Sequence, residues 1–199
     1  WLSAPSPTAS PNLGSVSRLD LYKEHAGVDL TAIFPPHPNR DPELVNAWTY
    51  EAFLQATEKL DSAGYPFGAA ISPTPDGTNW LSATFSAYGA EFVNRDGEVT
   101  VNSDEVRNLL EYMSRLTQFM PDSVYAWDDA SNNRFMISGK GSAAINPPSI
   151  WAVSSRDMPA VAEQLWHHDA PRGPEGRYRA VAPFFWGRIR LYFQRHQKI

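Results

Sequence analysis

The stretch TYEAFLQATEKLDSAGYPFGAAI, residues 49–71, predicts a helix that is followed at once by a buried strand. Thr49 can cap the helix, because its hydroxyl can accept a hydrogen bond from a backbone N–H of the first turn. Apolar side chains recur at helical spacing from Tyr50 to Leu60, and Gly64 is a typical residue to end a helix. The apolar run at 67–71 has the length of a strand. Alternation of helix and strand is typical of an α/β fold, which we predict.

The same alternation continues along the chain. The clearest further helix spans about 103–120, where apolar residues form one stripe, Asn102 is the expected cap and Pro121 ends the helix. We expect shorter helices at 19–25, 80–88, 129–138, 148–156 and 158–165, strands at 142–146 and 178–182, and a small hairpin at 92–101.

Composition excludes several classes of function. The net charge of −5 argues against a nucleic-acid partner, because phosphate binding needs a basic face. The chain has no Cys, which rules out disulfides, thiol catalysis and Cys-ligated zinc. No apolar run reaches 18 residues, so we expect no membrane-spanning helix. Residues 1–17 are rich in Ser, Pro and Ala, lack the features of a signal peptide, and are expected to be poorly ordered.

Seven tryptophans are present, and three of them adjoin short polar clusters. Trp80 follows Asp76 and Asn79, Trp127 begins the run WDDASNNR, and Trp151 ends the run NPPSIW. An indole face can stack on the C–H face of a sugar ring, while amides, carboxylates and guanidinium groups bind its hydroxyls. The pattern indicates carbohydrate recognition. The alternative is a core role for each ring, since Trp is highly buried on average.

The order and spacing of several phrases resemble the family 1 sugar-binding group of extracellular solute-binding proteins of ABC transporters. The resemblance extends from about Leu19 to Gly187. The phrases that carry it are 48–54, 63–68, 79–81, 88–93, 125–134, 139–141, 146–149 and 183–187.

The resemblance implies a periplasmic-binding-protein-like (class II) lobe, helix-rich with a small mixed sheet. It also implies a periplasmic or extracellular location, no cofactor, no enzymatic activity, a carbohydrate ligand bound between two lobes, and a permease as partner. Trp80, Asp128 and Asn146 are the strongest candidates for ligand contact. The full set carried over from the family is Asp76, Asn79, Trp80, Trp127, Asp128, Asn132, Asn133, Arg134, Asn146, Ser149 and Trp186.

The two ends depart from the family pattern. We therefore expect an incomplete second lobe at 18–187, with non-matching segments at 1–17 and 188–199. Half of a two-lobed clamp offers half of the contacts and cannot exclude water by closing. We expect the isolated chain to bind sugar no more tightly than about millimolar, the weak end of the affinity scale.

Two other functions stay open, a carbohydrate-active enzyme and a folded remnant without a ligand. Asp128 and Asp129 are adjacent, so their side chains diverge and cannot form the facing carboxylate pair of a glycosidase. Pairing of Asp128 with Glu91 or Asp169 stays open. His167, His168 and Asp169 lack the spacing of a metal site, and we predict a solvated loop there.

Overall fold

The computed structural model describes residues 3–5, 12–181 and 185–187, and side chains from 14 to 180. Its centre is a mixed sheet in the order β3-β4-β2-β5, with β6 paired to β2. Strands β3 and β4 are parallel, whereas β2 runs antiparallel to β4, β5 and β6. A separate antiparallel pair joins β1 to β7. The strands are β1 Ser3–Pro5, β2 Asn12–Arg18, β3 Phe67–Gly68, β4 Ala143–Asn146, β5 Leu165–His168, β6 Ala180–Val181 and β7 Phe185–Gly187.

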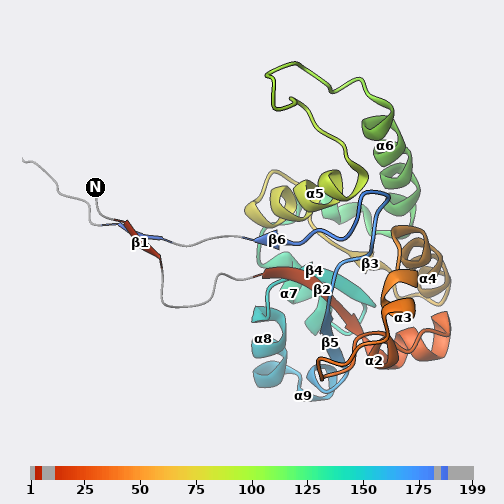
Figure 1. Cartoon of the computed structure of the whole chain (residues 1–199). Helices are drawn as coiled ribbons and strands as arrows, with labels where there is room; N and C mark the ends of the chain where they lie inside the picture. Colours follow the sequence, from red (N-terminus) through yellow and green to blue (C-terminus); the bar gives the residue numbers. More distant parts are fainter. Residues whose placement is uncertain (1–2, 6–11, 182–184, 188–199) are drawn as a thin grey trace, which may run out of the picture.

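Helices cover both faces of this sheet (Figure 1). The α-helices are α1 Leu19–Leu21, α2 Leu30–Ile33, α3 Pro42–Ala47, α4 Tyr50–Ser62, α5 Pro75–Tyr88, α6 Asp104–Leu116, α7 Ser131–Ile137, α8 Ser149–Asp157 and α9 Pro159–Ala162. A π-helix, η1 Tyr22–Ala26, continues α1, and two 3-10 helices, η2 Thr117–Phe119 and η3 Asp122–Ala126, follow α6. The α/β class and the small mixed sheet predicted from the sequence are confirmed.

Two apolar clusters fix the layers. On one face, Phe53 of α4 packs edge-on against Phe67 of β3, with the two ring centroids 5.1 Å apart. On the other face, Val16 and Ala144 of the sheet meet Met136 of α7 in a second buried cluster. Side chains on a strand alternate between faces, so Ala143 and Ala144 of β4 belong to different clusters. The sheet is thereby buried on both sides.

Local signals placed the longer helices correctly. Thr49 accepts a hydrogen bond from the backbone N–H of Ala52, as the sequence predicted for the cap of α4, and Gly64 has the positive φ of 88° that favours glycine. The cap of α6 is Ser103 rather than the predicted Asn102. Helix α5 begins earlier than expected, because Thr74 caps it and Pro75 fits the first helical position.

Strand β2 contradicts the expected disorder at residues 12–17, whereas residues 1–2 and 6–11 of that segment and the predicted tail at 188–199 lie outside the described residues. Its registers pair Gly14 with Asn146 and Ser15 with His168, so the segment lies between β4 and β5. Ser15 and Ser17 are buried, because small side chains fit a strand with neighbours on both sides. The boundary predicted at residue 18 therefore divides a strand of the sheet.

Three further expectations differ from the structure. The predicted helix at 158–165 is only the short α9, and β5 follows it, so the predicted solvated loop at His167 and His168 is wrong. The hairpin at 92–101 is reduced to one bridge between Val93 and Val99. Within the described ranges, no helix has the length and apolar character needed to cross a bilayer.

Gly141 is required by the packing of Phe135 against the sheet. The three atoms nearest to a Cβ built at Gly141 all belong to the Phe135 ring. Gly141→Ala is therefore expected to lower the free energy of unfolding by about 1–3 kcal/mol, the usual cost of overpacking. Urea unfolding measures this loss. In a Phe135→Leu background the same change should cost less than half as much, and equal costs in both backgrounds would contradict the assignment.

Candidate functional site

The polar residues gather at the edge where β3, β4 and β5 end. These three strands run in one direction, so their carboxyl ends share an edge of the sheet. Helices α5 and α8 begin just after β3 and β4, and α7 begins at the same edge because it leads back into β4. In open α/β sheets, ligands bind beyond the carboxyl ends of the strands. This edge is the candidate site.

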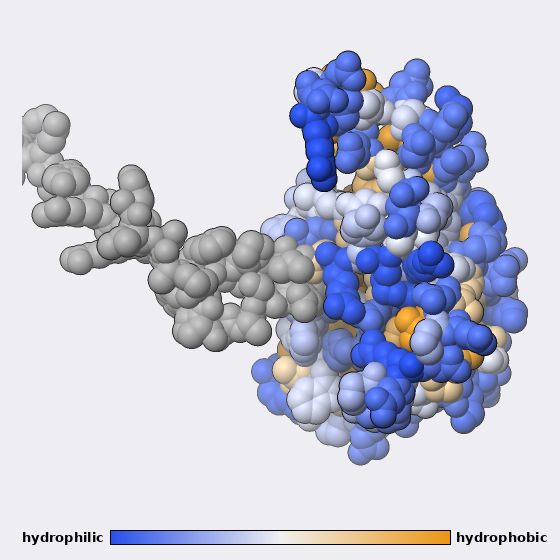
Figure 2. Space-filling view, viewed as in Figure 1, coloured by the Kyte–Doolittle hydropathy of each residue, from blue (hydrophilic) through white to orange (hydrophobic). Residues whose placement is uncertain are grey.

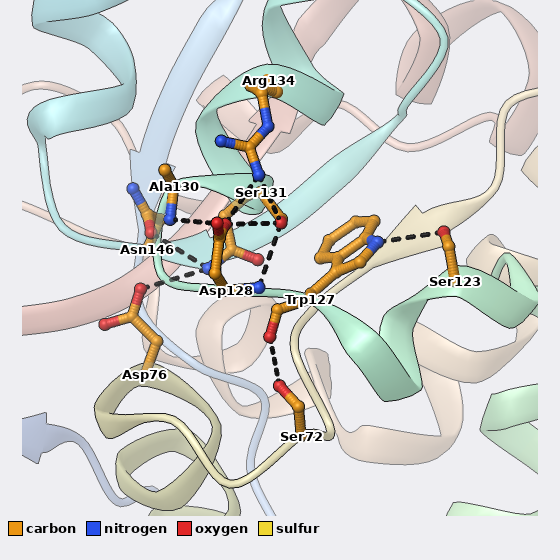
Figure 3. A network of polar contacts seen from close by, with 10 residues as sticks. Ser72, Asp76, Ser123, Trp127, Asp128, Ala130, Ser131, Arg134 and Asn146 are labelled. Carbon is orange, nitrogen blue, oxygen red and sulfur yellow. Dashed lines mark hydrogen bonds and ion pairs between the residues drawn. The ribbon is translucent and has the colours of Figure 1, made fainter.

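A hydrogen-bonded group, here named the amide cluster, joins three helices at this edge. Asn132 Nδ2 of α7 donates to Asp76 Oδ2 of α5 at 3.1 Å and to Asn146 Oδ1 of β4 at 3.2 Å. Asn146 Nδ2 in turn donates to Asn133 Oδ1 at 2.8 Å and to Ser149 Oγ of α8 at 3.1 Å. Figure 3 shows Asp76 and Asn146 approaching from different elements. Five of the eleven predicted site residues thus meet.

Burial divides the amide cluster into two kinds of residue. Asn132 and Asn146 are 0% and 1% exposed, so they position their neighbours and do not offer a surface to a ligand. Asp76 and Asn133 are half-buried, and Ser149 is exposed. Asn132 Oδ1 has no hydrogen-bond partner among the described residues. The accessible oxygen and amide groups of the cluster are those of Asp76, Asn133 and Ser149.

Asp76 lies in an unusual electrostatic setting. Burial raises the pKa of this carboxyl, the nearby carboxylate of Asp129 raises it further, and the hydrogen bond from Asn132 opposes both effects. Asp129 also accepts a bond from the Asp76 backbone N–H at 3.4 Å. A carboxylate at the start of helix α5 is a good acceptor for a sugar hydroxyl.

Asp128 and Arg134 form a local arrangement at the start of α7. Asp128 Oδ1 accepts from Ser131 Oγ and from Arg134 Nη2, both at 2.7 Å, and both side chains of the ion pair are exposed. The hydroxyl of Ser131 and the guanidinium of Arg134 lower the pKa of Asp128. Figure 3 shows this group beside the amide cluster. Its contacts account for Asp128 as a residue that stabilises the start of α7.

The expected aromatic face is not formed by the predicted rings. Trp80 is 6% exposed and its Nε1 donates to the Ala70 carbonyl at 2.7 Å, while Trp127 is 8% exposed and packs on Phe135. The apolar cavity beside Trp80 has only about 30 Å³, room for about one water. The prediction that Trp80 and Trp127 offer open stacking faces is wrong. Trp151, in the first turn of α8, is 52% exposed.

For two of the predicted site residues, Asn79 and Trp186, the structure describes no side-chain hydrogen bond to the other candidate residues. Asn79 is half-buried on α5 and makes no side-chain hydrogen bond with the described residues. The side chain of Trp186 lies outside the described residues, although its backbone belongs to β7. Across the ranges with described side chains, no three His, Asp or Glu residues gather as metal ligands would.

Sequence reasoning missed an ionic group at the end of β5. Asp169 accepts from Arg40 Nη1 at 2.9 Å and from Arg179 Nη2 at 2.7 Å. These two arginines, here named the arginine pair, lie 139 positions apart in the sequence (179 minus 40). The run of arginines after residue 170 was the available signal, but it gives no indication of Arg40.

Comparison with known proteins identifies the fold. No family model and no curated relative matches the chain. Among solved structures, maltose-bound MalE3 of T. maritima superposes with a TM-score of 0.65 at 17% identity, over 87% of this chain and 44% of that one. This chain has the fold of sugar-binding proteins of ABC transporters.

Further solved structures give the same result. A solute-binding protein of Agrobacterium radiobacter K84 in complex with ribitol has a TM-score of 0.61 at 19% identity, over 89% of this chain and 43% of that one. The GacH receptor of Streptomyces glaucescens, solved with acarbose, has a TM-score of 0.60 at 15% identity, over 94% of this chain and 44% of that one. This chain therefore spans less than half the length of the structures it matches. The periplasmic-binding-protein-like fold predicted from the sequence is confirmed.

Proposed function

We propose that this chain forms one lobe of a saccharide-binding protein that serves an ABC transporter. The observation that carries the proposal is the position of the amide cluster. It lies at the carboxyl edge of the sheet in a fold that solved neighbours use to bind maltose, ribitol and acarbose. Asp76, Asn133 and Ser149 would bind sugar hydroxyls, and Trp151 is the accessible ring that could stack on a sugar face.

The path of the chain supports the assignment to a single lobe. Strand β2 enters the sheet beside β6, with Asn12 opposite Val181, and the chain enters and leaves the body on one side (Figure 1). Beyond this point β1 and β7 pair again. The described body therefore begins and ends at adjacent positions, Asn12 and Val181, and this would suit attachment to an opposing lobe whose closure would remove a bound sugar from water. Delivery to a permease, and a location outside the cytoplasmic membrane, belong to the same proposal.

Binding is favoured over catalysis, because the solved neighbours are binding proteins and receptors. The proposal is tested by titrating the ¹⁵N-labelled chain with maltose, laminaribiose and ribitol. We expect amide shifts at residues 76, 133 and 149 with an affinity of about millimolar or weaker, because one lobe makes half of the contacts.

The matched control is Gln118, an exposed amide side chain remote in sequence from the amide cluster. Asn133→Ala should abolish the shifts at residues 76 and 149, and Gln118→Ala should leave them unchanged. Absence of any shift with all three ligands, and with glucuronate and glucose 6-phosphate, would contradict saccharide binding. Micromolar affinity in the isolated chain would contradict the single-lobe assignment.

A further inference from the structure

The arginine pair leaves positive charge at the surface of the candidate edge. The side chain of Asp169 is 17% exposed, whereas those of Arg40 and Arg179 are 42% and 56% exposed. Burial alone would raise the pKa of Asp169, but the guanidinium groups of Arg179 and Arg40 reverse that effect and lower it. The carboxylate is thus ionised and neutralises only one of its two partners.

A third guanidinium adds to this excess. Arg177 is half-buried and donates to the carbonyl groups of Ala170, Val45 and Trp48, and it forms no ion pair with a carboxylate among the described side chains. Its charge and that of Asp169 act on one another across the same region. Two cations therefore contact a single carboxylate, and a third is close enough to interact with it electrostatically. An anion that approached the arginine pair would meet a net positive field.

The arginine pair is held in place and still has donors to offer. Arg40 lies over the Phe34 ring, with its Cζ 5.8 Å from the ring centroid, and Phe34 stacks on buried His168. A guanidinium carries five N–H donors. Arg40 and Arg179 each use one nitrogen on Asp169, and neither side chain has another hydrogen-bond partner among the described residues. Guanidinium groups fixed in this way suit two-point binding of a carboxylate or phosphate.

A hollow of about 330 Å³ adjoins the arginine pair, within the size range of small-molecule sites. It is lined by Gly14, Arg40, Pro148, His167, Asp169 and Arg179. The face of the molecule that Figure 2 presents is largely hydrophilic, with few hydrophobic groups.

The hollow and the amide cluster lie beside neighbouring strands, and Pro148, which lines the hollow, precedes Ser149 of the cluster. Gly14 of β2 lies opposite Asn146 of β4, and the next residue, Ser15, lies opposite His168 of β5. Strand β2 lies between β4 and β5, so two strand spacings, about 10 Å in all, separate the backbones of the strands that carry Asn146 and His168. A disaccharide, or a monosaccharide with an extended substituent, could reach both.

We propose that the ligand of this site is an anionic saccharide, with its hydroxyls on the amide cluster and its carboxylate or phosphate on Arg40 and Arg179. This inference rests on the proposed function and adds the chemical class of the ligand. A uronic acid and a sugar phosphate share the required chemistry, and the experiment separates them.

The test compares four probes on the ¹⁵N-labelled 199-residue chain: glucuronate, glucose 6-phosphate, glucose and acetate. At least one anionic sugar is expected to shift the amides of residues 167–170 together with residue 149, and to bind about tenfold more tightly than glucose, a typical gain for a charged contact. Whichever of glucuronate and glucose 6-phosphate binds more tightly identifies carboxylate or phosphate as the preferred group. Raising the NaCl concentration should weaken the binding of the anionic sugar and leave the affinity for glucose unchanged.

Two variants localise the effect. Arg179→Gln and Arg40→Gln should each remove most of the tenfold preference, while Arg107→Gln, which makes the same charge change on α6, should leave it intact. Arg179 is largely exposed, so its variant should retain the spectrum of the folded chain. If Arg40→Gln unfolds the chain, Arg179→Gln alone decides the result.

The outcomes separate this inference from the proposed function. Equal binding of glucose and both anionic sugars, with shifts at the amide cluster, would overturn the anionic ligand and leave saccharide binding intact. Acetate as effective as glucuronate would overturn the saccharide part of the inference. Absence of shifts with every probe would overturn both proposals.

Discussion

Asn146→Leu is expected to lower the free energy of unfolding by about 3–5 kcal/mol, because it removes the residue that joins α7, β4 and α8. Asn146 is 1% exposed, and its side-chain amide forms hydrogen bonds with Asn132, Asn133 and Ser149. Leucine has the same branched arrangement of side-chain heavy atoms but cannot form a hydrogen bond with any of them. The buried amide of Asn132 would lose one of its two acceptors, and an unsatisfied buried polar group costs about 1–3 kcal/mol by itself. Urea unfolding at neutral pH measures the loss.

The control removes one exposed partner and keeps Asn146. Ser149→Ala deletes a hydroxyl that water can replace, so it should cost less than about 1 kcal/mol. Loss of binding in Ser149→Ala with unchanged stability would agree with a contact role for this residue. An Asn146→Leu variant as stable as the parent chain would show that the amide cluster does not hold these elements together.

The sequence predicted those elements whose signals are local. The helix at 50–62 has an apolar stripe, a capping Thr49 and a terminating Gly64 within one short stretch, and each of these acts through neighbours along the chain. The same holds for α6, apart from a one-residue error at its cap. Asn132, Asn133 and Asn146 were named as candidates through the resemblance to the sugar-binding family, and the structure shows that they are hydrogen-bonded to one another.

The remainder depends on contacts between distant segments. Nothing within residues 12–18 predicts a central strand, since Ser15 and Ser17 become buried only when β4 and β5 flank them. The indole of Trp80 looks like a ligand platform in the sequence, but the Ala70 carbonyl satisfies its N–H inside the core. The arginine pair is joined through Asp169, which lies 129 positions after Arg40 (169 minus 40).

Acid should destabilise the chain through His168, by about 3 kcal/mol between neutral pH and pH 4. His168 is buried, stacks on Phe34, and has Nδ1 2.9 Å from the Asp169 carbonyl and Nε2 2.9 Å from Ser17 Oγ. A carbonyl can only accept, so Nδ1 carries the proton of the neutral ring and Nε2 accepts from the hydroxyl. Burial lowers the pKa of His168 to about 4.

The direction of the effect follows from the protons bound in each state. Unfolded histidine binds a proton below about pH 6.5, while folded His168 does so only near pH 4. Between these values the unfolded chain binds more protons, so stability is lost as the pH falls through this window. Burial also lowers the pKa of His167, which adds to the loss, and the raised pKa of Asp76 opposes it.

Urea unfolding of the parent chain and of His168→Gln at pH 7 and pH 4 isolates this residue from the others. The parent should lose about 2–3 kcal/mol more than His168→Gln, even if the variant is less stable at both pH values. His37→Gln, which changes an exposed histidine, should lose as much unfolding free energy between pH 7 and pH 4 as the parent chain does. Equal losses in the parent and in His168→Gln would mean that His168 is not held neutral at the end of β5.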